Sequence, residues 1–237
     1  MKRIVADLHI HTNFSPCASE EMVPGAIVQT ALERGLGVIA ICDHNTTANS
    51  NRVREAASGG LVVLQGMEIT TCEEVHVLGL FGDDAQASAV GSAVSESLSE
   101  ALGARNPGEK EGVFHKGGSK PKLFSSATTL SIEESVGIIR NNGGLAVAAH
   151  IDRPSFSVLG QLGFIPEGVK FDAVEITGSY SCCEELLSLG LPVIASSDSH
   201  SLWDIGRMCT VFELYAPTWK EIVLAMKGRG GRRCWVA

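Results

Sequence analysis

The sequence predicts an α/β protein in which a largely parallel sheet or barrel forms one domain. Two observations predict this fold class. Apolar runs of strand length alternate with segments of helical periodicity, and most of the seven histidines lie at the ends of those runs. A chain of 237 residues can bury most of its apolar surface in a single core, and α/β barrels of this length are common. We therefore expect a single domain over residues 1–237.

Each predicted strand is a run rich in Val, Ile, Leu or Ala, and the predicted helices repeat apolar residues every three or four positions. The strands are expected at residues 3–12, 38–42, 61–69, 75–81, 145–149, 171–176, 191–195 and 210–214. The helices are expected at residues 20–34, 47–57, 83–102, 131–141, 183–189 and 218–227. Ser131 and Glu134 have the spacing of a capping box, which supports a helix start at that point.

Two connections depart from the alternation of strand and helix. The turn between strands 61–69 and 75–81 is too short for a parallel crossover, so these strands are expected to form a hairpin with Glu68 and His76 near its turn. The region around residues 103–128 contains Gly and Lys and has almost no apolar periodicity. We interpret this insertion as a mobile surface loop and a candidate lid over the site.

The first strand carries the pair His9 and His11. Side chains alternate faces along a strand, so both imidazoles point to the same side and could form half of a metal site. The alternative is that they are two ordinary histidines. Asp198 and His200 repeat the same spacing after a later strand, and barrel enzymes collect their catalytic groups at strand ends. The repeated pattern favours the metal site.

The remaining candidate ligands are also at strand ends or turns: His44, Glu68, His76 and His150. Imidazole and carboxylate together suit Zn, Mn or Fe. A carboxylate can bridge two ions, and a metal pair about 3.5–4 Å apart activates water and clamps a phosphoryl group. The acidic residues Asp7, Asp43 and Glu175 are candidates to orient the ligands through hydrogen bonds.

A set of ordered motifs connects these residues: D-L-H-I-H-T at 7–12, C-D-H at 42–44, Glu68, V-H at 75–76, A-H at 149–150 and S-D-S-H at 197–200. Together they resemble the motifs of the polymerase and histidinol phosphatase (PHP) family. The resemblance covers residues 7 to 200. It implies a distorted seven-stranded (β/α) TIM-like barrel that hydrolyses phosphoesters with two or three divalent metal ions.

The resemblance also implies which residues hold each metal. One ion would be bound by His9, His11, Glu68 and Asp198. A second would share Glu68 and add His76 and His150, and a third position would use His44 and His200.

The segment S-P-C-A at 15–18 lacks the Asp or His that completes the third position in the family. Either Cys17 replaces it as a thiolate, or the third metal is weak or absent. We favour a Cys17 that is buried or that supports a ligand. His44, beside Asp43, could then act in catalysis as a general acid near the leaving group.

Phosphate recognition is expected from Arg153 and Arg207, which follow the His150 and His200 motifs. A guanidinium can bind phosphate through two parallel hydrogen bonds. Surface salt bridges are the alternative for both arginines. Phe156 and Trp203 could stack a nucleobase or could simply pack, and the sequence does not choose between these roles.

The formal net charge of -8 does not favour binding along a nucleic-acid backbone, where basic surface supplies most of the affinity. We therefore expect a small phosphorylated metabolite or a nucleotide as substrate, and no long nucleic acid. The chain shows no apolar run near ~18 residues and no signal-peptide pattern, so we expect no membrane partner and a cytoplasmic location. The oligomeric state is left open.

Two other functions compete with a phosphoesterase that uses metal-activated hydroxide. An amidohydrolase-like barrel also uses an H-x-H pair and a late aspartate, although the hairpin ligands and the terminal D-x-H motif count against it. A catalytically silent metal-binding module serving a partner protein is the second alternative. The near-complete ligand set disfavours that interpretation.

Overall fold

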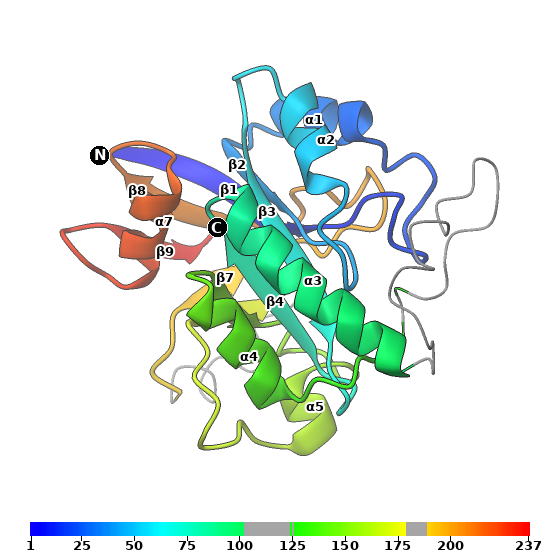
Figure 1. The fold of residues 1–237 in the computed structure, drawn as a ribbon. Coiled ribbons are helices and arrows are strands. Elements are labelled where there is room, and N and C mark those ends of the chain that lie inside the picture. The colour runs from blue at the N-terminus through cyan, green and yellow to red at the C-terminus, as the bar shows by residue number, and fades with distance from the viewer. Residues whose placement is uncertain (102–123, 125, 179–188) are drawn as a thin grey trace.

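The computed structural model describes residues 1–101, 124, 126–178 and 189–237. Strands and helices alternate over most of this part (Figure 1). The strands are β1 (Lys2–Ile10), β2 (Val38–Ile41), β3 (Val62–Thr70), β4 (His76–Phe81), β5 (Leu145–Ala148), β6 (Ala173–Ile176), β7 (Val193–Ala195), β8 (Thr210–Leu214) and β9 (Arg233–Val236). The helices are α1 (Pro24–Glu33), α2 (Ser50–Ala56), α3 (Asp84–Ala101), α4 (Ile132–Asn141), α5 (Val158–Leu162) and α7 (Trp219–Met226).

The described strands form one mixed sheet in the order β7-β6-β5-β4-β3-β2-β1-β8-β9. Pairing is parallel within β1–β2–β3 and within β5–β6–β7. It is antiparallel where β4 joins these two groups and where β8 and β9 extend the sheet beyond β1. The predicted hairpin of β3 and β4 is therefore confirmed.

The sheet curves into a nearly closed barrel because the segment after β7 returns to β1. Ser199 forms a parallel bridge with Ile10, and the backbone N–H of His11 donates to the Ser199 carbonyl at 3.0 Å. The Thr210 hydroxyl in β8 joins β7 from the other side, since it donates to the Ala195 carbonyl and accepts from the Ala195 N–H. This closure gathers the ends of β1 and β7 at one place.

The predicted count of seven strands was wrong, because the sheet has nine. The eight apolar runs of the sequence correspond to β1–β8, and the ninth strand lies in the basic tail at residues 228–237, which lacks apolar periodicity. Residues 233–236 pair antiparallel with β8 there. Backbone hydrogen bonds to a neighbouring strand stabilise this edge strand without a fully buried face.

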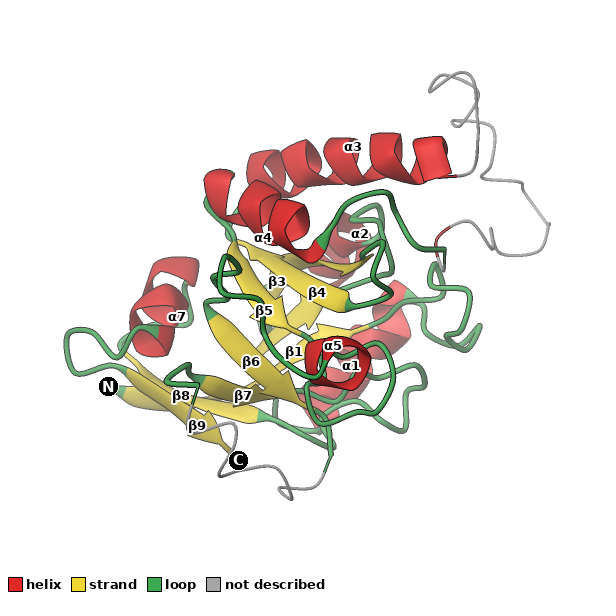
Figure 2. Ribbon diagram, turned by 90° about the horizontal axis from the view of Figure 1, so that it is seen from below, coloured by secondary structure: helices red, strands yellow, loops and turns green. Residues whose placement is uncertain are grey.

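Most strands of the barrel are buried on both faces, which explains their continuous apolar runs. Helices cover the outside of the sheet (Figure 2). α3 and α4 lie side by side over β3, β4 and β5, and α7 packs on β8 and β9. The predicted capping box is present at the start of α4, where Ser131 and Glu134 each accept a backbone hydrogen bond from the other.

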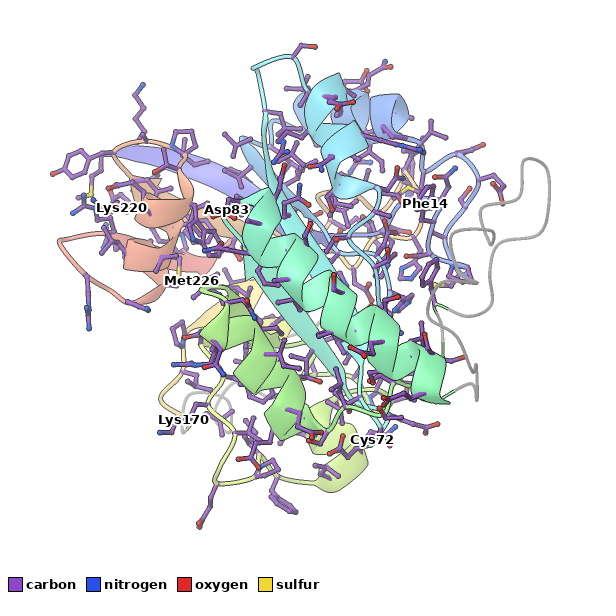
Figure 3. The ribbon with its side chains drawn as sticks, in the orientation of Figure 1. Phe14, Cys72, Asp83, Lys170, Lys220 and Met226 are labelled. Carbon is purple, nitrogen blue, oxygen red and sulfur yellow. The ribbon has the colours of Figure 1, made fainter. Side chains whose placement is uncertain are left out.

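Figure 3 labels a residue at each end of the β3–β4 hairpin. Cys72 lies in the turn between the two strands, and Asp83 lies between β4 and α3. Its register pairs Glu68 with Leu78 and Thr70 with His76. The two predicted ligands of the hairpin therefore lie at its Cys72 end, as the sequence indicated.

Some expectations fall on other parts of the chain. The helix at 183–189 and most of the insertion at 103–128 lie outside the described residues, so both stay predictions. At the described end of the insertion, Thr128 donates from its N–H and its hydroxyl to the Thr70 carbonyl. The short helix α5 was not predicted from the sequence. Within the described residues, each helix is too short or too polar to span a bilayer.

We expect Gly66→Ala to destabilise the barrel. A Cβ at position 66 would lie 2.8 Å from the Ile41 carbonyl oxygen and against the Cys42 sulfur, so β2 and β3 would have to separate. The free energy of unfolding, measured by urea denaturation, should fall by about 1–3 kcal/mol. Gly137→Ala in α4 is the matched control, because nothing lies near its Cβ position; it should raise stability by about 0.5–1 kcal/mol. Equal stability of the two variants would contradict this packing.

Candidate metal centre

The structure brings all the predicted ligands to one end of the barrel. β1 supplies a pair of imidazoles, the loop after β2 supplies one, the hairpin supplies a carboxylate and an imidazole, and the loops after β5 and β7 supply the others. These residues are His9, His11, His44, Glu68, His76, His150, Asp198 and His200. All except His200 are buried. All of them except His150 form three overlapping groups that could each hold a metal ion.

The first group is His9, His11, Glu68 and Asp198. The Nε2 atoms of the two imidazoles are 3.0 Å apart. Asp198 Oδ1 lies 3.3 Å from the first nitrogen and 3.1 Å from the second. Glu68 Oε2 lies 3.6 Å and 3.2 Å from the same two nitrogens. Four potential ligand atoms therefore converge on one point.

Hydrogen bonds on the far side of each ring fix where the protons are. The Nδ1 of His9 is 3.0 Å from Glu175 Oε2, an acceptor, so this nitrogen carries the hydrogen. The Nδ1 of His11 is 2.8 Å from Ser15 Oγ, and that hydroxyl donates its own hydrogen to Asp43 at 2.6 Å. Nδ1 of His11 is thus also the donor. In the neutral form of each ring, Nε2 presents a lone pair to the centre.

This arrangement fits a cation. With both rings neutral, two nitrogen lone pairs and two carboxylate oxygens face one another at 3.0–3.6 Å, so a metal ion or a proton is needed between them. A tetrahedral ion with bonds of about 2.0–2.1 Å separates its ligands by about 3.3 Å, close to the spacing seen here. The donor set suits a divalent ion.

A second group consists of His44, Glu68 and His76, with His150 beside it, and Glu68 connects this group to the first. Its Oε1 lies 2.7 Å from His76 Nδ1 and 3.1 Å from His150 Nε2, and these two nitrogens are 3.1 Å apart. Its Oε2 faces the first group and also lies 2.9 Å from His44 Nδ1. One carboxylate oxygen thus faces each group, which is the arrangement that a bridging ligand needs.

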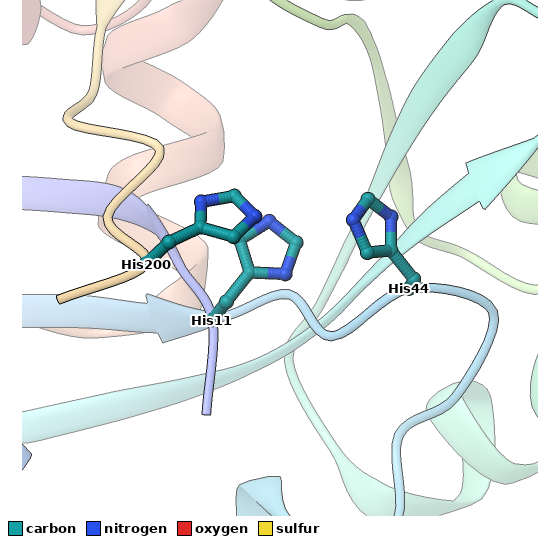
Figure 4. Close-up of side chains that lie close together, drawn as sticks. All are labelled: His11, His44 and His200. Carbon is teal, nitrogen blue, oxygen red and sulfur yellow. The ribbon is translucent and has the colours of Figure 1, made fainter. Parts of the chain in front are cut away.

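The third group is His11, His44 and His200 (Figure 4). The His200 ring stacks on that of His11 with centroids 4.1 Å apart, and His44 faces His11 at 4.6 Å. Cys17 is exposed rather than buried, contrary to our first expectation, and it is one of the groups that raise the pKa of His44. Our second expectation, that Cys17 supports a ligand, stays a prediction.

Opposite charges compensate one another within the cluster. Burial raises the pKa of the Glu68 carboxyl, but His76, His44 and His9 hold that pKa well below its usual range. Burial likewise raises the pKa of Asp198, and the neighbouring imidazoles lower it further than burial raises it. Burial lowers the pKa of His9, but the facing carboxylates raise it well above its usual value. Protons and metal ions thus compete for the same nitrogens.

The three acidic residues that we expected to orient ligands take different roles. Glu175 binds two ligands directly, since it accepts from His9 Nδ1 and from the backbone N–H of His150 at 3.1 Å. Asp7 accepts from the backbone N–H and hydroxyl of Ser197 and from the Gly206 N–H at 3.0, 2.6 and 2.8 Å. Asp7 thus holds the loop that carries the late ligands.

Asp43 supports the first strand. Its carboxylate accepts from the N–H and hydroxyl of Thr12 at 2.8 and 2.7 Å and from the Ser15 hydroxyl. It reaches His11 through Ser15, so the structure places it behind a ligand; its catalytic role stays a prediction. Ser15 was missed in the sequence, although its position four residues after His11 is a usable signal.

The two predicted phosphate-binding arginines differ in position. Arg153 lies against the cluster, with Nη1 2.5 Å from Asp198 Oδ2 and Nε 3.0 Å from Thr177 Oγ1. Arg207 is 64% exposed and forms a 2.9 Å ion pair with Asp204. Both line a polar cleft of about 380 Å³ beside the cluster, and Arg153 also lines a smaller pocket over the second group. Thr177, which fixes Arg153, had no sequence signal.

Comparison with known proteins places this geometry in a family. The sequence matches the family described as PHP domain over residues 7–163, more than half of the chain. The chain belongs to the PHP family. Residues 184–229 match the region described as PHP-associated. The predictions of the PHP family and of a metal-dependent phosphoester hydrolase are confirmed.

Related proteins extend the match. The 5'-3' exoribonuclease Rnm of Escherichia coli K12 is 26% identical over 270 residues, which cover 91% of this chain and 90% of that protein. The lesion-specific endonuclease PfuEndoQ from Pyrococcus furiosus superposes with a TM-score of 0.77 at 19% identity. Endonuclease Q in complex with a 27-mer duplex bearing an abasic lesion gives 0.71 at 20%. Each superposition covers 98% of this PHP chain and 58% of the other chain.

These relatives overturn one expectation. We inferred from the net charge of -8 that long nucleic acid is no partner, yet the proteins similar to this chain in sequence or fold include nucleases. Net charge describes attraction averaged over the whole surface. It does not report the capture of one phosphate in a cleft by metal ions and a nearby guanidinium, which is a local effect.

We expect Glu175→Gln to weaken metal binding. The amide still accepts the hydrogen of His9 Nδ1 but removes a negative charge that makes the opposite nitrogen a stronger ligand. The dissociation constant for Zn²⁺ or Mn²⁺, measured by isothermal titration calorimetry, should rise about 10- to 100-fold. The exposed Glu133→Gln in α4 is the control and should bind as the wild type does. Unchanged affinity in Glu175→Gln would contradict this role.

Proposed function

We propose that this PHP protein is a metal-dependent phosphodiesterase that cleaves nucleic acid at or near a chain end. The observation that supports this most is the bridging position of Glu68 between two converging ligand groups beside an arginine-lined cleft. The similarity to the exoribonuclease Rnm over 91% of the chain supports nucleic acid as the substrate class.

Each metal position has its own residues. We assign one ion to His9, His11, Glu68 and Asp198, and a second to Glu68, His76 and His150. A third position is formed by His11, His44 and His200. Divalent ions such as Zn, Mn or Fe would supply Lewis-acid activation of water and neutralise charge on the phosphoryl group.

The chain's own residues bind and orient the substrate. Arg153 lies between the ligand cluster and the polar cleft, so its guanidinium can bind a phosphate oxygen while Thr177 holds its Nε. Burial lowers the pKa of His44, but Glu68 and Cys17 raise it, to about 9. Where the third position holds no ion, His44 therefore carries a proton near neutral pH and can donate it to the leaving oxygen.

A small phosphorylated nucleotide is the second candidate substrate. The polar cleft of about 380 Å³ lies within the size range of small-molecule sites. Hydrolysis of a terminal phosphate would need the same metals and the same arginine. The two candidates differ in the group that carries the leaving oxygen, which is the rest of a strand in one and a single nucleoside in the other. A comparison of the two kinds of substrate distinguishes them.

The purified protein with Mn²⁺ should cleave short 5'-phosphorylated RNA or DNA, followed by product release on denaturing gels. Mononucleotides and p-nitrophenyl phosphate serve as comparison substrates. Asp198→Asn and His9→Ala should each abolish turnover, since each removes a ligand of the first ion. Circular dichroism should show that both variants remain folded. Metal-loaded wild type that hydrolyses none of these esters would contradict the proposal and favour a catalytically silent module.

Salt dependence offers an independent test of how the substrate is held. Among the described residues, Arg153 and Arg207 are the basic side chains that line the cleft. If the substrate makes two phosphate contacts, a plot of the logarithm of the binding constant against the logarithm of the salt concentration should have a slope of about -1.4 for a single strand. Arg153→Ala should reduce the magnitude of the slope by about 0.7, the share of one contact. The exposed Arg140→Ala, which pairs with Asp172, should leave it unchanged. A wild-type slope steeper than about -4 would show a long basic track instead.

A further inference from the structure

Building on the proposed function, we propose that Phe156 is a stacking platform for the nucleobase next to the phosphate held at the metal centre. The sequence left two aromatic residues, Phe156 and Trp203, undecided between packing and stacking. The structure separates them by what each ring contacts.

The Phe156 ring covers one face of a metal-site imidazole. It stacks on His76 with centroids 4.7 Å apart and planes inclined by 18°. The residue is nevertheless 42% exposed, and it lines the pocket of about 130 Å³ over the second ligand group with Ser155 and Arg153. One face of the ring is therefore packed on His76, while the residue keeps an exposed part beside the pocket.

Trp203 has different surroundings. It is 77% exposed, and its ring lies 5.8 Å from the guanidinium of Arg34. It does not line either cleft at the metal centre among the described residues. Its position suits packing against the α1 side of the molecule rather than contact with a substrate.

The backbone holds Phe156 in a conformation that a bulky side chain rarely adopts. Its φ is 58°, in the left-handed region that favours Gly and Asn. The carbonyl of Phe156 accepts the backbone N–H of His76 at 2.8 Å, which fixes this conformation. Two ligands of the site, His150 and Asp198, share a positive φ. Strain of this kind concentrates at functional sites, and packing alone would not require an aromatic ring at this position.

The loop that carries Phe156 is rigid. The Arg153 N–H donates to the His150 carbonyl at 2.9 Å, and the Ser157 hydroxyl donates to the Arg153 carbonyl at 2.6 Å. Ser157 Oγ also accepts from the N–H of Gly160, where a Cβ would collide with the Pro154 carbonyl oxygen at 2.5 Å. The platform is thus formed before a substrate arrives, so stacking would not have to order the loop.

The chemistry of the pocket favours a base over another flat group. Arg153, three residues before Phe156, lies at the metal cluster and can bind the phosphate, so one loop would contact two parts of one nucleotide. Base stacking on an aromatic ring tolerates every base because each has a π face. The platform would therefore position the nucleotide without selecting a sequence.

The test compares matched substrates with and without the base. One pair is a short oligonucleotide and the same strand with a tetrahydrofuran abasic residue at either nucleotide flanking the cleaved phosphate. The second pair is AMP and ribose 5-phosphate, so that a preference for mononucleotides is also covered. The variant is Phe156→Asn, because Asn tolerates the left-handed backbone; Phe164→Asn, an exposed phenylalanine outside the described pockets, is the control.

In the wild type and in Phe164→Asn, removal of the base at one position should lower kcat/KM about 5- to 100-fold. In Phe156→Asn, kcat/KM on the intact substrate should fall by a similar factor, and removal of the base should then change little. Metal content and Tm should match the wild type.

Three results would overturn the platform while leaving the proposed function intact. In the first, removal of the base lowers kcat/KM as much in Phe156→Asn as in the wild type. In the second, Phe156→Asn lowers kcat/KM equally on substrates with and without the base. In the third, Phe156→Asn loses bound metal, and that loss accounts for its lower activity. The last two would show that the ring acts only by packing on His76. If the wild type hydrolyses neither pair, the proposed function fails, and the platform fails with it.

Discussion

The buried carboxylate of Glu68 constrains the rest of the site. It lies on the hairpin among imidazoles that come from other strands and loops, and it is almost completely buried. A charge in such a place must be compensated by nearby positive groups or by metal ions. Each surrounding strand end is therefore fixed in position, and the hydrogen bonds of Glu175, Asp7 and Ser15 hold those ends in turn.

Much of this could be predicted from the sequence because it depends on local periodicity. Alternation along a strand placed His9 beside His11, and the short turn of the hairpin placed Glu68 near His76. Closure of the barrel at Ser199 could not be predicted, since it depends on backbone hydrogen bonds between distant segments. The edge strand β9 and the left-handed Phe156 likewise depend on partners that the local pattern does not reveal.

The inference from net charge to the absence of a long nucleic-acid partner was wrong because net charge averages over the whole surface. The acidic ligands contribute to that charge, yet they lie in the interior, where bound cations would neutralise them. The groups that a phosphate would contact at the cleft are instead Arg153 and the metal positions. An acidic protein can therefore act on a polyanion, provided that it contacts a short stretch of it.

Closure of the barrel between β1 and the segment after β7 has a consequence for synthesis of the protein. Asp198 and His11, whose side chains meet at 3.1 Å, are separated by 187 positions in sequence. Contacts of this range form late and slowly in folding. During translation the early histidines emerge well before Asp198, so the complete first metal position cannot form on a partly synthesised chain. Acquisition of the ion is consequently coupled to completion of the fold, and an incomplete chain presents only a weaker, open set of ligands.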